Sequence, residues 1–114
     1  MKKVICVTAI ALVASTVLAI YGTGWGKQAT STTAIGNVSG FSANSVSVLN
    51  EGTNDVFVLS NIATGAFATR MTAGTCIRIP SQATYTFDSG GKDSIANICH
   101  ATTNASSPIT IDAY

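Results

Sequence analysis

His100 is the only histidine of the chain, and therefore the one side chain whose ordinary pKa suits general base catalysis near neutral pH. A Ser-His-Asp arrangement would also need a carboxylate and a nucleophilic hydroxyl held close by the fold. Serine and threonine are plentiful, but none lies in a nucleophile-elbow sequence of the form Gly-x-Ser-x-Gly. A single histidine at a strand end is typical of a surface or partly buried residue. We therefore predict no catalytic residues and no enzyme.

The five carboxylates lie where turns are expected. Glu51 and Asp55 flank one cluster of turn residues, Asp88 and Asp93 flank another, and Asp112 lies near the end of the sequence. The loop from Asp88 to Asp93 offers oxygen ligands for Ca²⁺, but it lacks the alternating ligand spacing and the bidentate glutamate of a dedicated site. Asp in such positions usually accepts hydrogen bonds from nearby backbone. The sequence predicts no metal site and no cofactor.

The three cysteines fall into two groups. Cys6 lies inside an apolar N-terminal run, where it acts as a small hydrophobic residue. Cys76 and Cys99 remain as an even pair in the rest of the chain. If the isoleucines that alternate with them point into a core, both sulfurs lie on the opposite faces of their strands, where they could meet. We predict a Cys76–Cys99 disulfide, worth roughly 3 kcal/mol by the chain-entropy estimate. The alternative is two separate buried thiols.

The histidine, the carboxylates and the cysteines must be positioned by short runs of alternating apolar and polar residues, which turn residues separate. The runs cover residues 45–49, 55–60, 65–71, 75–79, 84–87, 94–101 and 109–111. Their near-regular spacing, with no helical periodicity after the N-terminal run, predicts an all-β fold. We expect a small antiparallel β-sandwich or barrel of about seven strands over residues 41–114. Its expected core is Val46, Val48, Val56, Val58, Phe67, Ile77, Ile79, Tyr85, Phe87, Ile95, Ile98, Ile109 and Ile111.

Residues 20–40 form a stretch rich in Gly, Thr and Ser that has little apolar surface to bury. Such a composition is typical of a flexible connection. We predict a linker over residues 20–40, joining the N-terminal run to the β-sandwich domain.

Residues 1–19 read as an export signal or as a membrane anchor. Two lysines precede an uncharged apolar run, and Ala19 ends it with the small residue that a signal peptidase requires. Cleavage is the favoured interpretation because the run is short. A retained hydrophobic helix is the alternative, since residues 4–20 reach the lower limit for crossing a bilayer. Tyr21 and Trp25 would then lie at the membrane interface, with Lys27 beyond them.

Charge excludes one class of partner. Without residues 1–19, four basic residues stand against five acidic ones, for a net charge of −1. Nucleic-acid binding needs a basic patch to neutralise phosphates, so we expect no nucleic-acid partner. The low charged fraction, 10% of the chain, and the abundance of Ser, Thr, Ala and Asn favour a secreted or virion surface over a cytosolic enzyme.

Four stretches of the C-terminal two thirds are residues 50–58 (NEGTNDVFV), 74–80 (GTCIRIP), 94–98 (SIANI) and 108–111 (PITI). Together they resemble a type of small bacteriophage virion protein. The resemblance implies a capsid-associated or decoration-like β-sandwich, held by shape and strand edges, with no catalytic residues. Two features depart from it, because such proteins normally need no signal and no disulfide. A retained anchor would fit a virion with an internal membrane, or a virion protein held in the host envelope.

Two functions follow from these observations. The first is a structural virion component, associated with the capsid or a membrane, whose partners are other structural proteins or copies of itself. The membrane is a further partner if residues 1–20 are retained. The alternative is an exported bacterial periplasmic or cell-surface binding module, such as an adhesin or pilus-like subunit, whose exposed edge strands pair with partners. The expected location is accordingly a virion or the bacterial envelope.

Overall fold

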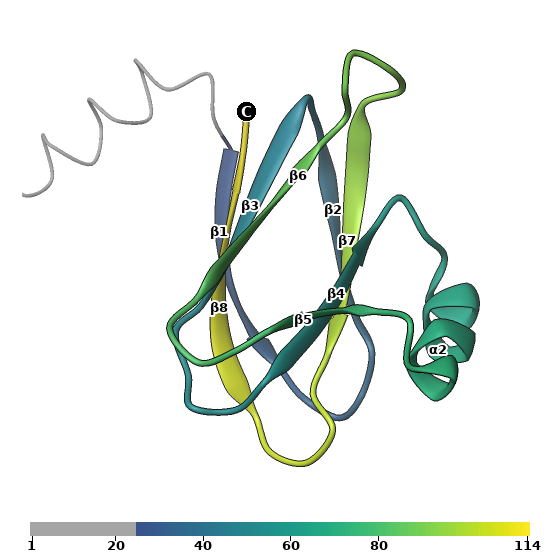
Figure 1. Ribbon diagram of the computed structural model, residues 1–114. Coiled ribbons are helices and arrows are strands. Elements are labelled where there is room, and N and C mark those ends of the chain that lie inside the picture. Colours follow the sequence, from purple (N-terminus) through teal and green to yellow (C-terminus); the bar gives the residue numbers. More distant parts are fainter. Residues whose placement is uncertain (1–24) are drawn as a thin grey trace, which may run out of the picture.

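The computed structural model describes residues 25–114. The expected N-terminal hydrophobic helix and the first part of the expected linker lie outside these residues. The described chain forms eight strands and one helix (Figure 1). In chain order they are β1 (Trp25–Ser31), β2 (Gly36–Ala43), β3 (Ser45–Asn50), β4 (Val56–Ser60), α2 (Thr64–Ala73), β5 (Ile77–Ile79), β6 (Thr84–Asp88), β7 (Ile95–Ala101) and β8 (Ser107–Ala113).

The strands form two four-stranded antiparallel sheets, in the orders β1-β8-β3-β6 and β2-β7-β4-β5. The first strand pairs with the last, the second with the seventh, the third with the sixth and the fourth with the fifth. The chain is thus one long antiparallel hairpin rolled up on itself, closed by the additional pairs β3–β8 and β4–β7. This is the jelly-roll topology. The predicted all-β sandwich is confirmed, with eight strands and an added helix.

Alternation of β-branched residues explains the core between the sheets. Val46 and Val48 on β3 pair with Ala113 and Ile111 on β8, and all four residues are buried. The main cluster of buried residues is Val38, Ala43, Val46, Val48, Val56, Val58, Ile79, Phe87, Ile95, Ile98, Ile109, Ile111 and Ala113. Most of the predicted core lies there. Ile77 is only partly buried, however, and Tyr85 is 39% exposed at the edge strand β6.

The predicted linker is wrong for the residues that the structure describes. Residues 25–31 form β1, which pairs with β8 over its whole length, and β2 begins at Gly36. Both are edge strands, so only one side of each needs a partner. Along β1 the inward positions carry Trp25, Lys27, Ala29 and Ser31, and this mixture hides the alternation that marks a strand.

The expected strand at 65–71 is instead the helix α2. Phe67 and Met71 are four residues apart and therefore lie on the same face of a helix, and three alanines favour helix formation. Gly74 ends the helix in the left-handed conformation, at φ 70°. The amides of Gly74 and Thr75 donate to the carbonyls of Met71 and Arg70, which forms a Schellman motif. The helix lies on the outer side of the sheet β2-β7-β4-β5 (Figure 1).

The sandwich has two distinct ends. At the first, here called the Trp25 end, β1 begins beside the end of β8, and Tyr114 is bonded to Asn44 in the β2–β3 turn. The β6–β7 turn also lies there, because Ser89 donates to the Asn44 carbonyl. The opposite end, called the far end, carries the connections β1–β2, β3–β4, β5–β6 and β7–β8 (Figure 1). Among the described residues, no helix is long and apolar enough to cross a membrane.

Candidate functional site

His100 is more deeply buried than predicted. It lies on the inner face of β7, 4% exposed, and its Nδ1 shares a hydrogen bond of 3.0 Å with Oγ of the fully buried Ser31. Gly36, its register partner on β2, packs against the ring. Burial lowers the pKa of His100, so the neutral imidazole is the stable form in the folded protein. The pair joins the end of β1 to β7 inside the sandwich and is closed to a substrate.

The expected Cys76–Cys99 disulfide is not present, and both residues are free thiols. The prediction that both sulfurs lie outside the main core is confirmed, because Cys76 packs against the satellite cluster that contains Cys99. The register explains the missing bond. Leu59 on β4 pairs with Cys99, and extending the β4–β5 register by one residue places Cys76 on the other side of Leu59. Two strand spacings separate their Cα atoms by roughly 10 Å, beyond the usual disulfide range.

The two thiols are partly or fully buried, which lowers their reactivity. Phe67 of α2 covers Cys99 and Ala101, and the Cys99 thiol donates to the carbonyl of Ile62 at 3.3 Å. Burial raises the pKa of Cys76 and that of Cys99. A thiol reacts as its thiolate, so both shifts lower the reactivity of these cysteines near neutral pH. The cluster therefore fixes the helix to the sheet.

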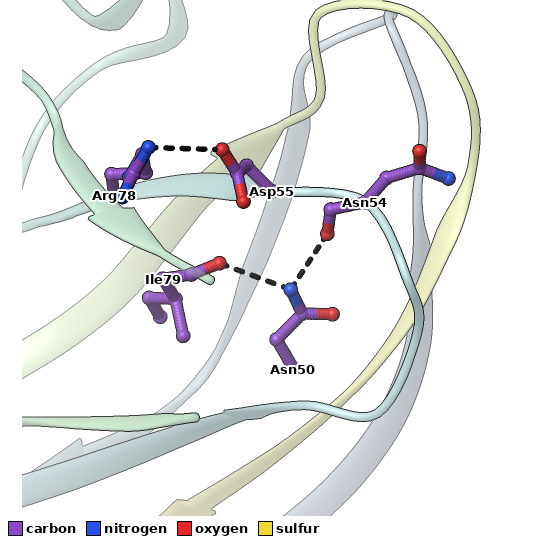
Figure 2. Close-up of polar contacts among 5 residues, drawn as sticks. All are labelled: Asn50, Asn54, Asp55, Arg78 and Ile79. Carbon is purple, nitrogen blue, oxygen red and sulfur yellow. Dashed lines mark hydrogen bonds and ion pairs between the residues drawn. The ribbon is translucent and has the colours of Figure 1, made fainter. Parts of the chain in front are cut away.

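A buried asparagine organises the far end of the sandwich (Figure 2). Asn50 is fully buried, and its Nδ2 donates to the carbonyls of Asn54 at 2.7 Å and Ile79 at 3.0 Å. Its Oδ1 accepts from the hydroxyl of Ser107 at 2.6 Å and from the amide of Gly52 at 3.1 Å. One side chain thus joins the β3–β4 turn to β5 and β8.

Of the carboxylates, Asp88 accepts from nearby backbone as expected, whereas Asp55 and Glu51 contact side chains. Asp55 forms an exposed ion pair with Arg78 at 3.3 Å (Figure 2), and Asp88 accepts a hydrogen bond from the amide of Gly90 in its own turn. Glu51 accepts a hydrogen bond from the hydroxyl of Thr110. Within residues 25–114, no three His, Cys, Asp or Glu side chains lie close enough together to hold a metal ion.

The outer face of the sheet β1-β8-β3-β6, here called the open face, carries mostly hydroxyl and amide groups. Residues that pair directly across antiparallel strands point to the same side, which assigns the members of this face from the register. They are Gln28, Thr30, Ser45, Ser47, Leu49, Thr84, Thr86, Asp88, Pro108, Thr110 and Asp112. No described element covers them, whereas α2 covers part of the opposite sheet (Figure 1).

A shallow groove of about 250 Å³ crosses one corner of the open face. It is lined by Gln28, Ala29, Thr30, Glu51, Pro108 and Ile109. Glu51 supplies its one charged group. An open groove of this size suits a contacting side chain better than an enclosed small molecule.

Sequence reasoning missed Asn50, Ser31 and Ser107 as inward-facing groups, although the signal was available. Asn50 continues the parity of Val46 and Val48, and Ser107 that of Ile109 and Ile111. All three were hidden because polar residues at strand ends resemble turn residues. No comparable signal marks the short contact of Gly36 with His100, which depends on the pairing of β2 with β7.

No protein-family model matches this sequence, and neither does any of the curated proteins. Among solved structures, the chain is similar to a de novo designed double-stranded β-helix, with a TM-score of 0.49, 13% identity, and coverage of 76% of this chain and 95% of that chain. It is similar to PirA at a TM-score of 0.49 and 14% identity, over 82% and 96% of the two chains. It is also similar to Bacillus endospore appendages, described as disulfide-linked pili, at a TM-score of 0.43 and 15% identity. The match covers 79% of this chain and 83% of that chain. The jelly-roll assignment itself rests on the strand order and register.

Proposed function

We propose that this chain is a non-enzymatic structural protein, most specifically a bacteriophage virion component associated with the capsid or a membrane. The observation that carries the proposal is the open face, a sheet surface of mostly short hydroxyl-bearing side chains that no described element covers. Short side chains lose little rotamer entropy on contact, and hydroxyls pair as donor or acceptor. Such a face suits repeated packing against other structural proteins or copies of the same chain.

The placement of the reactive groups supports a structural role. His100 and Ser31 are enclosed between the sheets, and Cys99 lies beneath α2. The His100–Ser31 hydrogen bond joins β7 to β1, and Cys99 packs β7 against α2. On this proposal the chain uses no cofactor, and nucleic acid is not among its partners, because the folded part carries few basic side chains.

The topology adds general support, since jelly rolls are recurrent in viral capsids and in lectins. A fold alone does not determine a function. The resemblance of residues 50–58, 74–80, 94–98 and 108–111 to small virion proteins favours the viral use of this fold over the others.

One observation favours the alternative, an exported bacterial periplasmic or cell-surface binding module. Strand β1 is seven residues long and is paired only with β8, so its other edge offers free backbone groups. A partner strand could add to this edge, as in β-strand addition. Both proposals place the protein in a virion or in the bacterial envelope.

Density-gradient sedimentation of particles released from the source culture tests the proposal. We expect the full chain to sediment with nuclease-protected particles. Thr84→Arg places a long charged side chain on the exposed open face and should sharply reduce incorporation, whereas Thr72→Arg, on an exposed position of α2, should not. Monomeric protein in the periplasmic fraction, absent from particles, would overturn the virion proposal and favour the binding module.

A further inference from the structure

Three aromatic side chains gather at the Trp25 end of the sandwich. The ring centroids of Trp25 on β1 and Phe41 on β2 lie 4.9 Å apart, and both residues are partly buried against the core. Tyr114 is 59% exposed at the same end. Its backbone is fixed there, because its amide donates to Ser45 and its carbonyl accepts from Asn44.

In the sequence, the apolar run closely precedes the strand that begins at this end. Residues 4–20 are uncharged and apolar, and only four residues separate them from Trp25. At no more than about 3.5 Å per residue, the start of β1 lies within roughly 17 Å of Ile20. The polar headgroup layer on each side of a bilayer is about 5–7 Å thick. On the alternative of a retained membrane anchor, the Trp25 end is therefore held at the membrane surface and the far end lies away from it.

We propose that the Trp25 end docks on a phospholipid bilayer, with Trp25 and Tyr114 in the headgroup layer. Tyr and Trp favour this layer because each has an apolar ring and a polar group that remains hydrated. The inference rests on the membrane association included in the proposed function, and it adds an orientation. The far-end loops then point away from the bilayer and are the part presented to partners.

The charges define the kind of membrane. The charged residues near the Trp25 end are Lys27, Lys92, Asp88, Asp93 and Asp112. Two bases against three acids give no net attraction to anionic lipids. The surface therefore fits zwitterionic phospholipid, and docking on phosphatidylcholine should not need anionic lipid.

The experiment uses the fact that Trp25 is the only tryptophan of the chain. The full chain is reconstituted into phosphatidylcholine vesicles, and tryptophan emission is measured with lipids that carry a quencher at headgroup depth. Two further proteins have one tryptophan elsewhere: Trp25→Phe with Tyr114→Trp at the Trp25 end, and Trp25→Phe with Ala105→Trp in the exposed β7–β8 loop. Flotation of the vesicles measures association separately.

We expect the chain to float with the vesicles, and both Trp25 and the tryptophan at 114 to lose most of their emission to the quencher. The tryptophan at 105 should keep its emission. Flotation with equal emission from positions 114 and 105 would overturn the docking while leaving membrane association intact. Chain that does not float would overturn it as well, and particle sedimentation would still decide the structural role independently.

Discussion

Gly36 on β2 lies directly against the imidazole ring of His100 on β7. A Cβ added at residue 36 would overlap with Cε1 and Nε2 of that ring. The ring cannot turn away easily, because its Nδ1 is bonded to Ser31 and it is enclosed by both sheets. The glycine is thus required by the close approach of a buried side chain.

Gly36→Ala should therefore destabilise the protein by about 1–3 kcal/mol, the usual cost of overpacking a rigid core. Urea denaturation gives the change in the free energy of unfolding. Gly65→Ala is the matched control, because a Cβ at Gly65 in α2 meets nothing within 4 Å. There the change should stabilise by up to about 1 kcal/mol, through higher helix propensity. Equal changes in the free energy of unfolding at the two positions would show that the His100 ring moves to make room for the added Cβ.

His100 should make stability depend on pH. Burial lowers its pKa in the folded protein, so the unfolded chain binds the proton more tightly. Its contribution is complete above about pH 6.5, the ordinary pKa of histidine, and is lost as the pH falls toward the lowered folded value. The urea concentration at the unfolding midpoint, measured from pH 7.5 down to pH 5, should therefore decrease as the pH is lowered through this window. The slope should disappear in His100→Gln, and a slope that persists there would assign the effect to other groups.

The thiols should remain free in the folded protein. Intact mass should not change with reductant, and a thiol reagent at neutral pH should modify Cys76 slowly and leave Cys99 unmodified until the protein is unfolded. The reason is that Cys99 is fully buried and Cys76 is partly buried, each with a raised pKa. A mass two daltons lower without reductant would contradict this, and would require β5 to move toward β7. Cys76→Ser should then abolish the difference.

The sequence predicted the fold best where strands are buried on one face. Val46 with Val48, and Ile109 with Ile111, show clean alternation, and their strands were recognised. Strand β1 was missed because its inward positions include Lys27 and Ser31, so its identity depends on β8 and not on its own residues. Helix α2 was missed because a single buried side chain, Phe67, determines its apolar face.

The candidate site was less predictable for a related reason. The alternation of Cys76 and Cys99 with neighbouring isoleucines indicated the faces on which they lie, but it gave no information about the strand between them. Only the sheet order places β4, and therefore Leu59, between β5 and β7. The open face likewise follows from the absence of a covering element in the described fold, and alternation within single strands does not reveal it.

Asn50 provides the sharpest test of the far end. In Asn50→Ala, the carbonyl of Ile79 and the hydroxyl of Ser107 lose their buried partner, and each unsatisfied group costs about 1–3 kcal/mol. We expect a total loss of about 3 kcal/mol in the free energy of unfolding, measured by urea denaturation. Asn54→Ala is the control, because the backbone carbonyl that Asn50 contacts is retained and the side-chain bond lost, to Ser106, is exposed. Its cost should stay below about 1 kcal/mol. Similar losses in the two variants would mean that Asn50 contributes through the local turn alone and does not join β3 to β5 and β8.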